Sequence, residues 1–209
     1  MDRIILTIAC GYLLGSVPFS LILGKLSTGI DLREHGSGNL GAANTFRTLG
    51  AMPGVGVLLL DVSKGAMSAI AGSLLWRQGI GLGEVDLMLV GGFSAVCGHI
   101  WTVFASFKGG KGVAAAAGMF ASIAPAAFGF SLAAWVLVVG VWRYVSLGSI
   151  VGAIVLPAAV YLTSARRVKG WESMFVVSLA VAILVLVVHR SNLKRLLQGT
   201  ERKLCIRGG

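Results

Sequence analysis

Residues 112–142 read GVAAAAGMFASIAPAAFGFSLAAWVLVVGVW, a run of 31 residues that carries no charge. One helix of that length would be about 46 Å long, whereas the hydrocarbon core of a bilayer is about 30 Å thick. Pro125 lies inside the run, and proline in a helix interior kinks or breaks the helix. The run therefore predicts two membrane segments, with the chain leaving and returning to the same side. The first, over Gly112–Ala124, is a short tilted span or a re-entrant segment, and the second ends at Trp142.

The composition of the whole chain is that of a membrane protein. Of its 209 residues, 56% are hydrophobic and 12% are charged, and its mean hydropathy is +0.87. Soluble domains carry about 25% charged residues, so an ordinary soluble enzyme and a disordered chain are both excluded. The formal net charge of +10 is typical of a membrane protein with a basic face. A nucleic-acid-binding protein would need a polar surface that this chain lacks, so we expect no nucleic acid as a partner.

Five further apolar stretches are candidate spans, and the first of them is free of charge and long enough to cross a bilayer. The first has no basic region before it and no clear cleavage site after it, which predicts a retained helix and not a signal peptide. Together with the two segments around Pro125, these stretches predict an all-α integral membrane protein with seven transmembrane helices. We expect residues 1–209 to form a single membrane-embedded domain, with 189–209 as a tail. The five stretches are Ile4–Gly24, Thr48–Trp76, Leu87–Phe107, Tyr144–Ala165 and Ser173–Val188.

The distribution of basic residues predicts the orientation. With seven helices, 12 basic residues lie on the side of the C-terminal tail and five on the other, whereas six helices would leave nine against eight. Basic residues accumulate in cytoplasmic loops, so the count favours seven helices, with the N-terminus outside and the C-terminus in the cytoplasm. The cluster of Arg166, Arg167 and Lys169 works against the rule. In this topology the loops at 32–50 and 107–112 and the tail all face the cytoplasm.

The first of these loops contains GSGNLGAANTFR at residues 36–47. Its glycines allow backbone N–H groups to approach an anion closely. Their spacing also fits a dinucleotide-binding fingerprint, but that motif needs a βαβ unit, which a membrane helix does not provide. The alternative is a simple Gly-rich turn, which would need neither two asparagines nor an arginine that can grip phosphate. The candidate site residues of this loop are Gly36, Ser37, Gly38, Asn39, Gly41, Asn44 and Arg47.

The second loop, FKGGKG at residues 107–112, precedes an apolar helical run. Unpaired N–H groups, the dipole at a helix N-terminus and two ammonium groups would together favour a phosphate. The loop is not a Walker A motif, because glycine follows its second lysine where that motif has Ser or Thr. The alternative is a cytoplasmic loop with two positive-inside lysines. The candidate phosphate-binding residues are Lys108, Gly109, Gly110, Lys111 and Gly112.

The tail begins with HRSNLKRLLQGTE at residues 189–201, whose leucines lie on one helical face and whose basic groups lie on another. The common interpretation of this pattern is an interfacial helix that contacts membrane lipids. His189 and Asn192 are one turn apart and could also face a site.

Three ionisable residues lie within the predicted spans. Asp61 and Lys64 are three residues apart, so they can pair on one helix face, and we expect a structural ion pair. His99 is either a packed polar link between helices or a residue with a direct role, because ionisable groups inside a membrane mark functional sites by default.

The polar stretches resemble the three motifs of the bacterial acyl-phosphate:glycerol-3-phosphate acyltransferases, the PlsY-type family. The resembling stretches are Gly36–Arg47, Gly98-His99 with Phe107–Ala114, and His189–Glu201, and further similarity lies in Gly15–Pro18, in Asp61 with Lys64-Gly65, and in Arg143–Leu147. The similarity extends from about Gly11 to the tail. One departure is Ala43, where the family usually has Thr, so no hydroxyl contact of that Thr can be carried over.

The resemblance implies an enzyme of the bacterial cytoplasmic (inner) membrane whose site faces the cytoplasm. It would transfer a fatty acyl group from long-chain acyl phosphate to the 1-hydroxyl of glycerol 3-phosphate, giving lysophosphatidic acid and phosphate, the first step of phospholipid synthesis. No cofactor is implied, and an enzyme that forms acyl phosphate is a candidate upstream partner. The implied catalytic residues are Ser37, Asn39, Arg47, His99 and Lys111. The implied substrate-binding residues are Gly36, Gly38, Gly41, Asn44, Lys108, Gly109, Gly110, Gly112, Arg143, Ser146, His189, Asn192 and Arg195.

The sequence favours direct transfer between the two substrates. No Ser-His-Asp arrangement is evident, and Cys10, Cys97 and Cys205 are too widely spaced to indicate a disulfide framework or a metal site. The base is then either His99 or a phosphate oxygen of the donor. A transporter of phosphate-bearing solutes is the alternative function, but it should show repeated halves, which this chain lacks. A lipid phosphatase would need a nucleophile or a metal cluster, and neither is visible.

Overall fold

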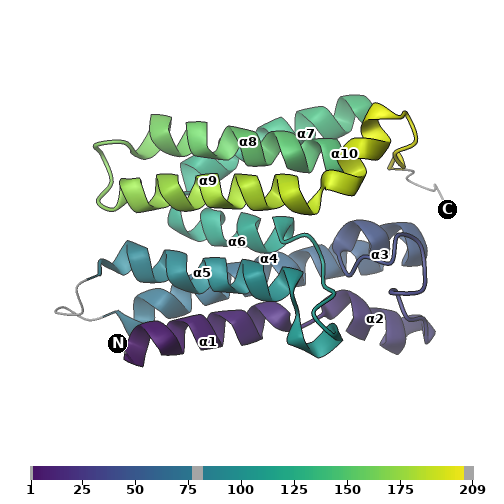
Figure 1. Cartoon of the computed structure of the whole chain (residues 1–209), viewed down its shortest axis with the longest axis horizontal. Helices are drawn as coiled ribbons and strands as arrows, with labels where there is room; N and C mark the ends of the chain where they lie inside the picture. The colour runs from purple at the N-terminus through teal and green to yellow at the C-terminus, as the bar shows by residue number, and fades with distance from the viewer. Residues whose placement is uncertain (1, 77–81, 205–209) are drawn as a thin grey trace. The chain divides into compact units, whose positions relative to one another are not determined.

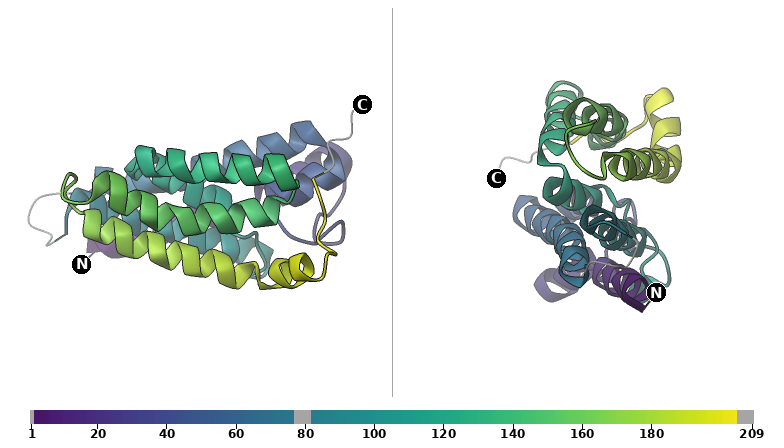
Figure 2. Two further views of the ribbon diagram at one scale, coloured as in Figure 1. Left: turned by 90° about the horizontal axis from the view of Figure 1, so that it is seen from above. Right: turned by 90° about the vertical axis from the view of Figure 1, so that its left-hand side faces the viewer.

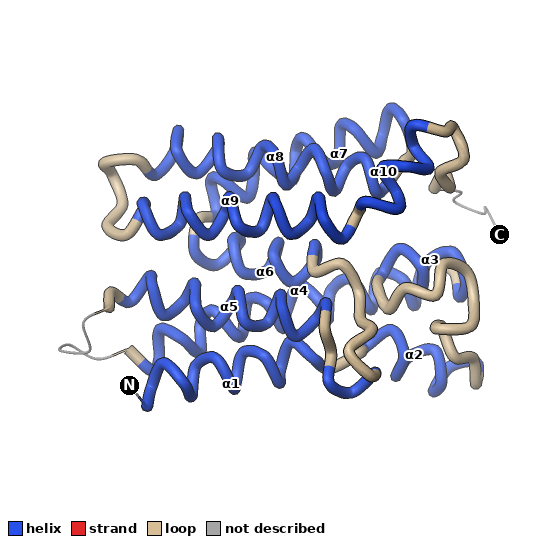
Figure 3. Tube along the Cα trace, viewed as in Figure 1, coloured by secondary structure: helices blue, strands red, loops and turns tan. Residues whose placement is uncertain are grey.

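The computed structural model describes residues 2–76 and 82–204, and in these ranges the chain forms helices joined by loops, without a strand (Figures 1 and 3). Arg77, Cys205 and Arg207, which enter the charge and cysteine arguments, lie outside the described residues. The chain divides into two compact units, one over Met1–Met119 and the other over Phe120–Cys205. The expectation of a single membrane-embedded domain stays a prediction.

The first unit begins with a helix that is interrupted by proline. The predicted continuous helix over Ile4–Gly24 is wrong, because the chain breaks at Val17-Pro18. Pro18 lacks an N–H group and disfavours the helical conformation of the residue before it. The helices of this part of the chain are α1 (Asp2–Ser16), α2 (Phe19–Thr28), α3 (Ala42–Leu49), α4 (Ala51–Leu75), α5 (Glu84–Ile100), the short 3-10 helix η1 (Val103–Ala105) and α6 (Val113–Ile123).

Small residues allow the helices of the first unit to pack closely. Helix α1 packs on α4 and α5, and α4 also packs on α5 and α3. A methyl group built on Gly65 of α4 would lie 2.0 Å from the backbone oxygen of Ala115 in α6. Such contacts are typical of membrane helices, which associate by close backbone approach at small residues. The high glycine content therefore serves helix packing as well as loops.

The second unit is built from α7 (Pro125–Trp142), α8 (Val145–Ser164), α9 (Trp171–Val188) and α10 (Arg190–Leu197). Pro125 occupies the first turn of α7, directly after α6 has ended, so the predicted break is confirmed. Helices α7, α8 and α9 run side by side (Figure 2). Tyr161 of α8 meets Trp171 and Phe175 of α9 edge to face, at ring-centroid distances of 6.0 and 6.2 Å. These rings fix the pairing of α8 with α9.

The long helices have the dimensions of membrane spans. In the described part of the chain, six segments are long and apolar enough to cross a bilayer, and α6 is a shorter apolar helix. Large apolar side chains point outward from these segments, such as Leu74 (79% exposed) and Leu137 (67% exposed). Outward apolar side chains suit a lipid environment, in which the hydrocarbon is the solvent.

Candidate active site

The first Gly-rich loop is folded around the side chain of Asn44, which lies buried in the first turn of α3. Asn44 Oδ1 accepts a hydrogen bond from the backbone N–H of Ser37 (2.8 Å), and Nδ2 donates to the backbone oxygens of His35 (3.1 Å) and Leu32 (3.3 Å). Gly36 adopts a φ of +66°, and a methyl group there would lie 2.3 Å from Asn44 Oδ1. Only glycine fits this position. The Asn44 amide is thus engaged in shaping the loop.

Two leucines anchor the same loop in the core. Leu32 and Leu40 are fully or almost fully buried and pack with Leu21 of α2 and Ala105 of η1. Between these anchors the loop extends outward, and Ser37 is exposed. Burial of two apolar side chains on either side of a polar tip holds that tip in place, because moving it would expose both leucines to water.

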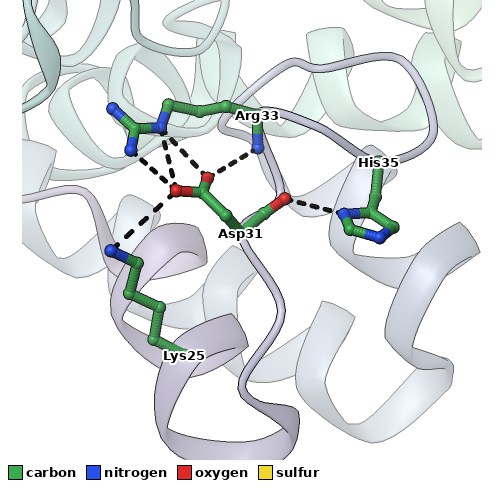
Figure 4. Close-up of polar contacts among 4 residues, drawn as sticks. All are labelled: Lys25, Asp31, Arg33 and His35. Atoms are coloured by element: carbon green, nitrogen blue, oxygen red, sulfur yellow. Dashed lines mark hydrogen bonds and ion pairs between the residues drawn. The ribbon is translucent and has the colours of Figure 1, made fainter.

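A charged cluster precedes the loop (Figure 4). The Asp31 carboxylate accepts hydrogen bonds from Arg33 Nε (3.0 Å) and Nη2 (2.7 Å), and Lys25 Nζ lies 3.9 Å from it. His35 Nδ1 lies 2.9 Å from the Asp31 backbone oxygen. The side-chain and backbone hydrogen bonds of Arg33 hold the pKa of Asp31 well below its usual range. The cluster therefore neutralises part of the basic charge beside the loop.

The backbone of the second loop caps the end of α5. The N–H of Gly109 donates to the Ile100 oxygen, the N–H of Gly110 to the His99 oxygen and the N–H of Lys108 to the Ala105 oxygen, each at 3.0 Å. The expectation that the N–H groups of this loop are open to a phosphate is therefore wrong for these three residues. Helix ends leave carbonyls without partners, and the loop satisfies them.

The groups beside this loop that remain able to bind phosphate are its two lysines and the backbone N–H groups at the start of α6. Gly112 has a φ of +76° and turns the chain into α6, which begins at Val113. The first-turn N–H groups of a helix have no partner within the helix and favour an anion. Lys108 is exposed and Lys111 is half-buried. The loop can therefore bind phosphate through charge and a helix N-terminus.

A hydrogen bond joins the two loops. Asn39 Nδ2 donates to the backbone oxygen of Gly109 at 3.3 Å, across 70 residues of sequence. Arg47, on α3, is half-buried. The structure thus brings the first two predicted motifs together within the first unit.

Asp61, Lys64 and His99, the three ionisable residues singled out within the predicted spans, form a buried group beside the second loop. Asp61 Oδ1 lies 2.8 Å from Lys64 Nζ on the same helix, so the predicted ion pair is confirmed. The same oxygen lies 3.4 Å from His99 Nδ1 on α5. His99 therefore links α5 to α4. Among the described residues, no three His, Cys, Asp or Glu side chains gather as metal ligands would.

In the second unit, three of the predicted site residues converge on Glu201. One oxygen of this carboxylate accepts from Ser146 Oγ and Asn192 Nδ2, and the other accepts from Arg195 Nε, all at 2.7 Å. Burial by itself raises the pKa of the Glu201 carboxyl, but the hydrogen bonds from Asn192, Ser146 and Arg195 outweigh it, so the pKa lies below its ordinary value. The carboxylate holds α8, α10 and the tail together.

The sequence by itself does not single out Glu201 as the residue on which these donors meet. Its one signal was a lone acidic residue in an otherwise basic tail. The other two predicted residues of this unit have different partners. His189 is buried, with Nδ1 2.8 Å from the Val185 oxygen, and Arg143 ends α7 with a φ of +62°. The Arg143 backbone oxygen accepts from the N–H of Leu204 at 2.7 Å, which ties the tail to the turn between α7 and α8.

Known proteins match the chain over nearly its whole length. The protein family described as glycerol-3-phosphate acyltransferase matches residues 5–199. The chain belongs to this family. The glycerol-3-phosphate acyltransferase of Trichlorobacter lovleyi is 43% identical over 197 residues, which cover 94% of this chain and 95% of that protein. The glycerol-3-phosphate acyltransferase of Chlorobaculum tepidum is 40% identical, and the match covers 94% of each chain.

Two solved structures share the fold of this acyltransferase. The crystal structure of PlsY, an integral membrane glycerol 3-phosphate acyltransferase, in its glycerol 3-phosphate form has a TM-score of 0.84 and 35% identity, and covers 97% of this chain and 96% of that chain. The lysophosphatidic acid form has a TM-score of 0.82 and 34% identity. These matches confirm the PlsY-type family, the enzyme class and an all-helical integral membrane architecture. The transporter and the lipid phosphatase are thereby set aside.

Proposed function

We propose that this acyltransferase transfers a fatty acyl group from long-chain acyl phosphate to the 1-hydroxyl of glycerol 3-phosphate. The products are lysophosphatidic acid and inorganic phosphate. The observation that carries the proposal is the hydrogen bond from Asn39 to Gly109, because it joins a loop with an exposed hydroxyl to a loop with two lysines. Both substrates carry phosphate, and the two PlsY crystal structures are a glycerol 3-phosphate form and a lysophosphatidic acid form.

The transfer is direct. The 1-hydroxyl oxygen attacks the acyl carbonyl carbon, the bond from that carbon to the bridging phosphate oxygen breaks, and phosphate leaves. Acyl phosphate is a mixed anhydride with a good leaving group, so positioning and neutralisation of charge supply most of the rate. The hydroxyl proton passes to a phosphate oxygen of the donor. His99, the other candidate base, has only 5% of its surface exposed and directs Nδ1 at Asp61.

The site residues of the first unit divide into two roles. Lys108, Lys111, Gly112 and the start of α6 bind phosphate, whereas Ser37, Asn39 and Arg47 position the reacting groups. Gly36, Gly38, Gly41 and Asn44 shape the first loop, since the Asn44 amide is engaged within it. Gly109 and Gly110 connect the second loop to α5.

In the second unit, His189, Arg143 and Arg195 are the proposed substrate contacts. Ser146 and Asn192 each donate to Glu201, so we assign them to positioning as well as to the lining of the site. The basic residues of this unit favour the negatively charged substrates.

We also propose seven membrane segments with the N-terminus outside and the tail in the cytoplasm of a bacterial cell. The support is the asymmetry of basic residues in the sequence. An enzyme that makes acyl phosphate must precede this reaction.

The phosphate-binding role of the second loop is tested with Lys111→Ala. Purified protein in detergent is given palmitoyl phosphate and glycerol 3-phosphate, and both products are measured. The variant should raise KM for glycerol 3-phosphate about tenfold or more, or abolish turnover, without unfolding the protein, because it removes a positive charge from a loop and not an apolar side chain from the core. Lys169→Ala, in the turn between α8 and α9, is the matched control. A variant with the parent's KM and rate would remove this loop from the phosphate site.

Direct transfer is tested on Ser37, the exposed hydroxyl of the first loop. The protein is mixed with acyl phosphate alone, quenched rapidly and examined by mass spectrometry. We expect no acyl group on the protein, because a serine needs an activating base to attack. The replacement of Cys10, Cys97 and Cys205 by Ser should leave substantial activity for the same reason. A kinetically competent acyl adduct on Ser37 or on a cysteine would make the enzyme ping-pong.

A further inference from the structure

Asp61, Lys64 and His99 form a buried polar group whose purpose the proposed reaction leaves unassigned. Their exposed fractions are 2%, 3% and 5%. One carboxylate oxygen of Asp61 faces both other side chains, at 2.8 Å from Lys64 Nζ and 3.4 Å from His99 Nδ1. Lys64 Nζ also donates to the Val17 backbone oxygen at 3.1 Å, at the break between α1 and α2. Ionisable groups inside a membrane protein are energetically costly, and their presence therefore indicates a role.

The ring of His99 lies directly against the second loop. A methyl group built on Gly110 would lie 2.0 Å from His99 Nε2, and one built on Gly109 would lie 2.0 Å from the His99 backbone oxygen. The N–H of Gly110 donates to that same oxygen. Gly110 is buried. The loop therefore contacts His99 in two ways, through the backbone hydrogen bond and through the packing of Gly110 against the ring.

The orientation of this ring is set from α4. With Nδ1 directed at Asp61, the ring presents Nε2 to the loop. Lys64 in turn pairs with the Asp61 carboxylate. Its hydrogen bond to the Val17 backbone oxygen connects α4 to the break between α1 and α2. Lys64, His99, Gly109 and Gly110 also line one narrow recess together with Ser16 and Pro18. The group is therefore continuous from the α1–α2 break to the glycines of the loop.

We propose that His99, oriented by the Asp61–Lys64 ion pair, is a positioning residue. It holds Gly109 and Gly110 so that the neighbouring Lys108, Lys111 and the start of α6 are placed to bind the phosphate of glycerol 3-phosphate. The inference rests on the proposed assignment of this loop to phosphate. His99 acts through the loop backbone and takes no proton from the acceptor hydroxyl. Asp61 acts only through His99.

The test separates positioning from base catalysis with two substitutions of His99. His99→Leu removes the contact with Asp61, whereas the amide of His99→Asn can still donate to Asp61 from the position of Nδ1. We expect His99→Leu to raise KM for glycerol 3-phosphate about tenfold with kcat lowered less than about threefold, and His99→Asn to restore KM to within about threefold of the parent. Ser68→Ala, another buried polar residue of α4, should keep the parent's KM.

Two results would overturn the positioning role of His99, and each differs from the expected change in KM. A loss of general base catalysis would lower kcat by about a hundredfold or more in both variants at an unchanged KM, and would overturn the proposal. A folded His99→Leu protein with the parent's KM and kcat would overturn it as well. Lys111→Ala is measured in parallel: a normal KM in that variant withdraws the loop's phosphate assignment, whereas a normal KM in His99→Leu alone withdraws only the positioning role.

A second variant tests the part played by Asp61 and Lys64. Asp61→Asn leaves Lys64 buried without a counter-charge and can prevent folding. The double variant Asp61→Leu with Lys64→Met removes both charges and is expected to fold. It should reproduce the rise in KM of His99→Leu, and adding His99→Leu should raise KM no further, because residues that act as one unit are not additive. Fully additive rises would contradict the proposal.

Discussion

Glu201 is a single carboxylate on which three donors of the second unit depend. Its side chain is 3% exposed and takes hydrogen bonds from Ser146, Asn192 and Arg195. Because a buried carboxylate with full hydrogen bonding favours its charged form, folding and ionisation of this group are linked.

Glu201→Gln keeps the shape of the side chain and removes its charge. A carboxyl whose pKa is lowered by folding stabilises the protein above its ordinary pKa, near 4.3, and this contribution is lost as the pH falls through the lower pKa of the folded state. At pH 7 we expect the variant to lose about 1–3 kcal/mol of stability, or roughly 2–10 °C in Tm. The difference from the parent should shrink as the pH falls below about 4.

The measurement is thermal unfolding in detergent at several pH values. Glu172→Gln, an exposed acidic residue in the first turn of α9, is the control and should change Tm little. A Glu201→Gln protein with the parent's Tm at pH 7 would show that the carboxylate charge contributes nothing.

Helix α4 has an outer side suited to lipid and an inner side that packs on other helices and carries the buried ion pair. Asp61, Lys64 and Gly65 are buried on one side of it, whereas Leu59 and Met67 are exposed on another. The inward side carries the Asp61–Lys64 ion pair. It also carries Gly65, whose lack of a side chain lets α6 approach closely.

Two glycines of α4 give a matched pair of substitutions. Gly65→Ala would place its methyl group 2.0 Å from the Ala115 oxygen, so α4 and α6 must separate. Gly56→Ala meets its nearest atom, Leu23 Cδ1, at an ordinary 3.7 Å. We expect Gly65→Ala to destabilise the protein by about 1–3 kcal/mol and Gly56→Ala to be neutral or stabilising by up to about 1 kcal/mol. Equal Tm values for the two variants would contradict the close packing of α4 and α6.

At the scale of the whole molecule, the distribution of 18 basic residues predicts the orientation in the membrane. The turn after α8 carries Arg166, Arg167 and Lys169 and opposes the rule, which makes position 166 the most informative place to label.

Single cysteines at positions 37, 108, 192 and 166, in a cysteine-free background, report the orientation in intact cells. We expect an impermeant thiol reagent to label position 166 and to label the other three only after the membrane is opened, because positive-inside counting places those three in the cytoplasm. Labelling of position 37 but not of 166 in intact cells would reverse the topology.

The helical class and the break at Pro125 could be predicted from the sequence, because both depend on properties that neighbouring residues share. An uncharged run must satisfy its backbone internally to enter lipid, and proline removes a hydrogen bond wherever it lies. The same local reasoning applied to Pro18 would have predicted the break between α1 and α2, which the unbroken hydropathy of Ile4–Gly24 concealed.

The three motifs could also be found from the sequence, since glycines, amides and basic groups, which are residue types suited to phosphate, lie close together along the chain. What those residues do was decided only by tertiary contacts. Asn44 folds the first loop, the N–H groups of Gly109 and Gly110 cap α5, and Ser146 reaches Glu201 across 55 residues. A polar side chain can serve a ligand or its own fold, and residue type alone does not distinguish the two, because the partner that satisfies each hydrogen bond is set by how distant segments pack.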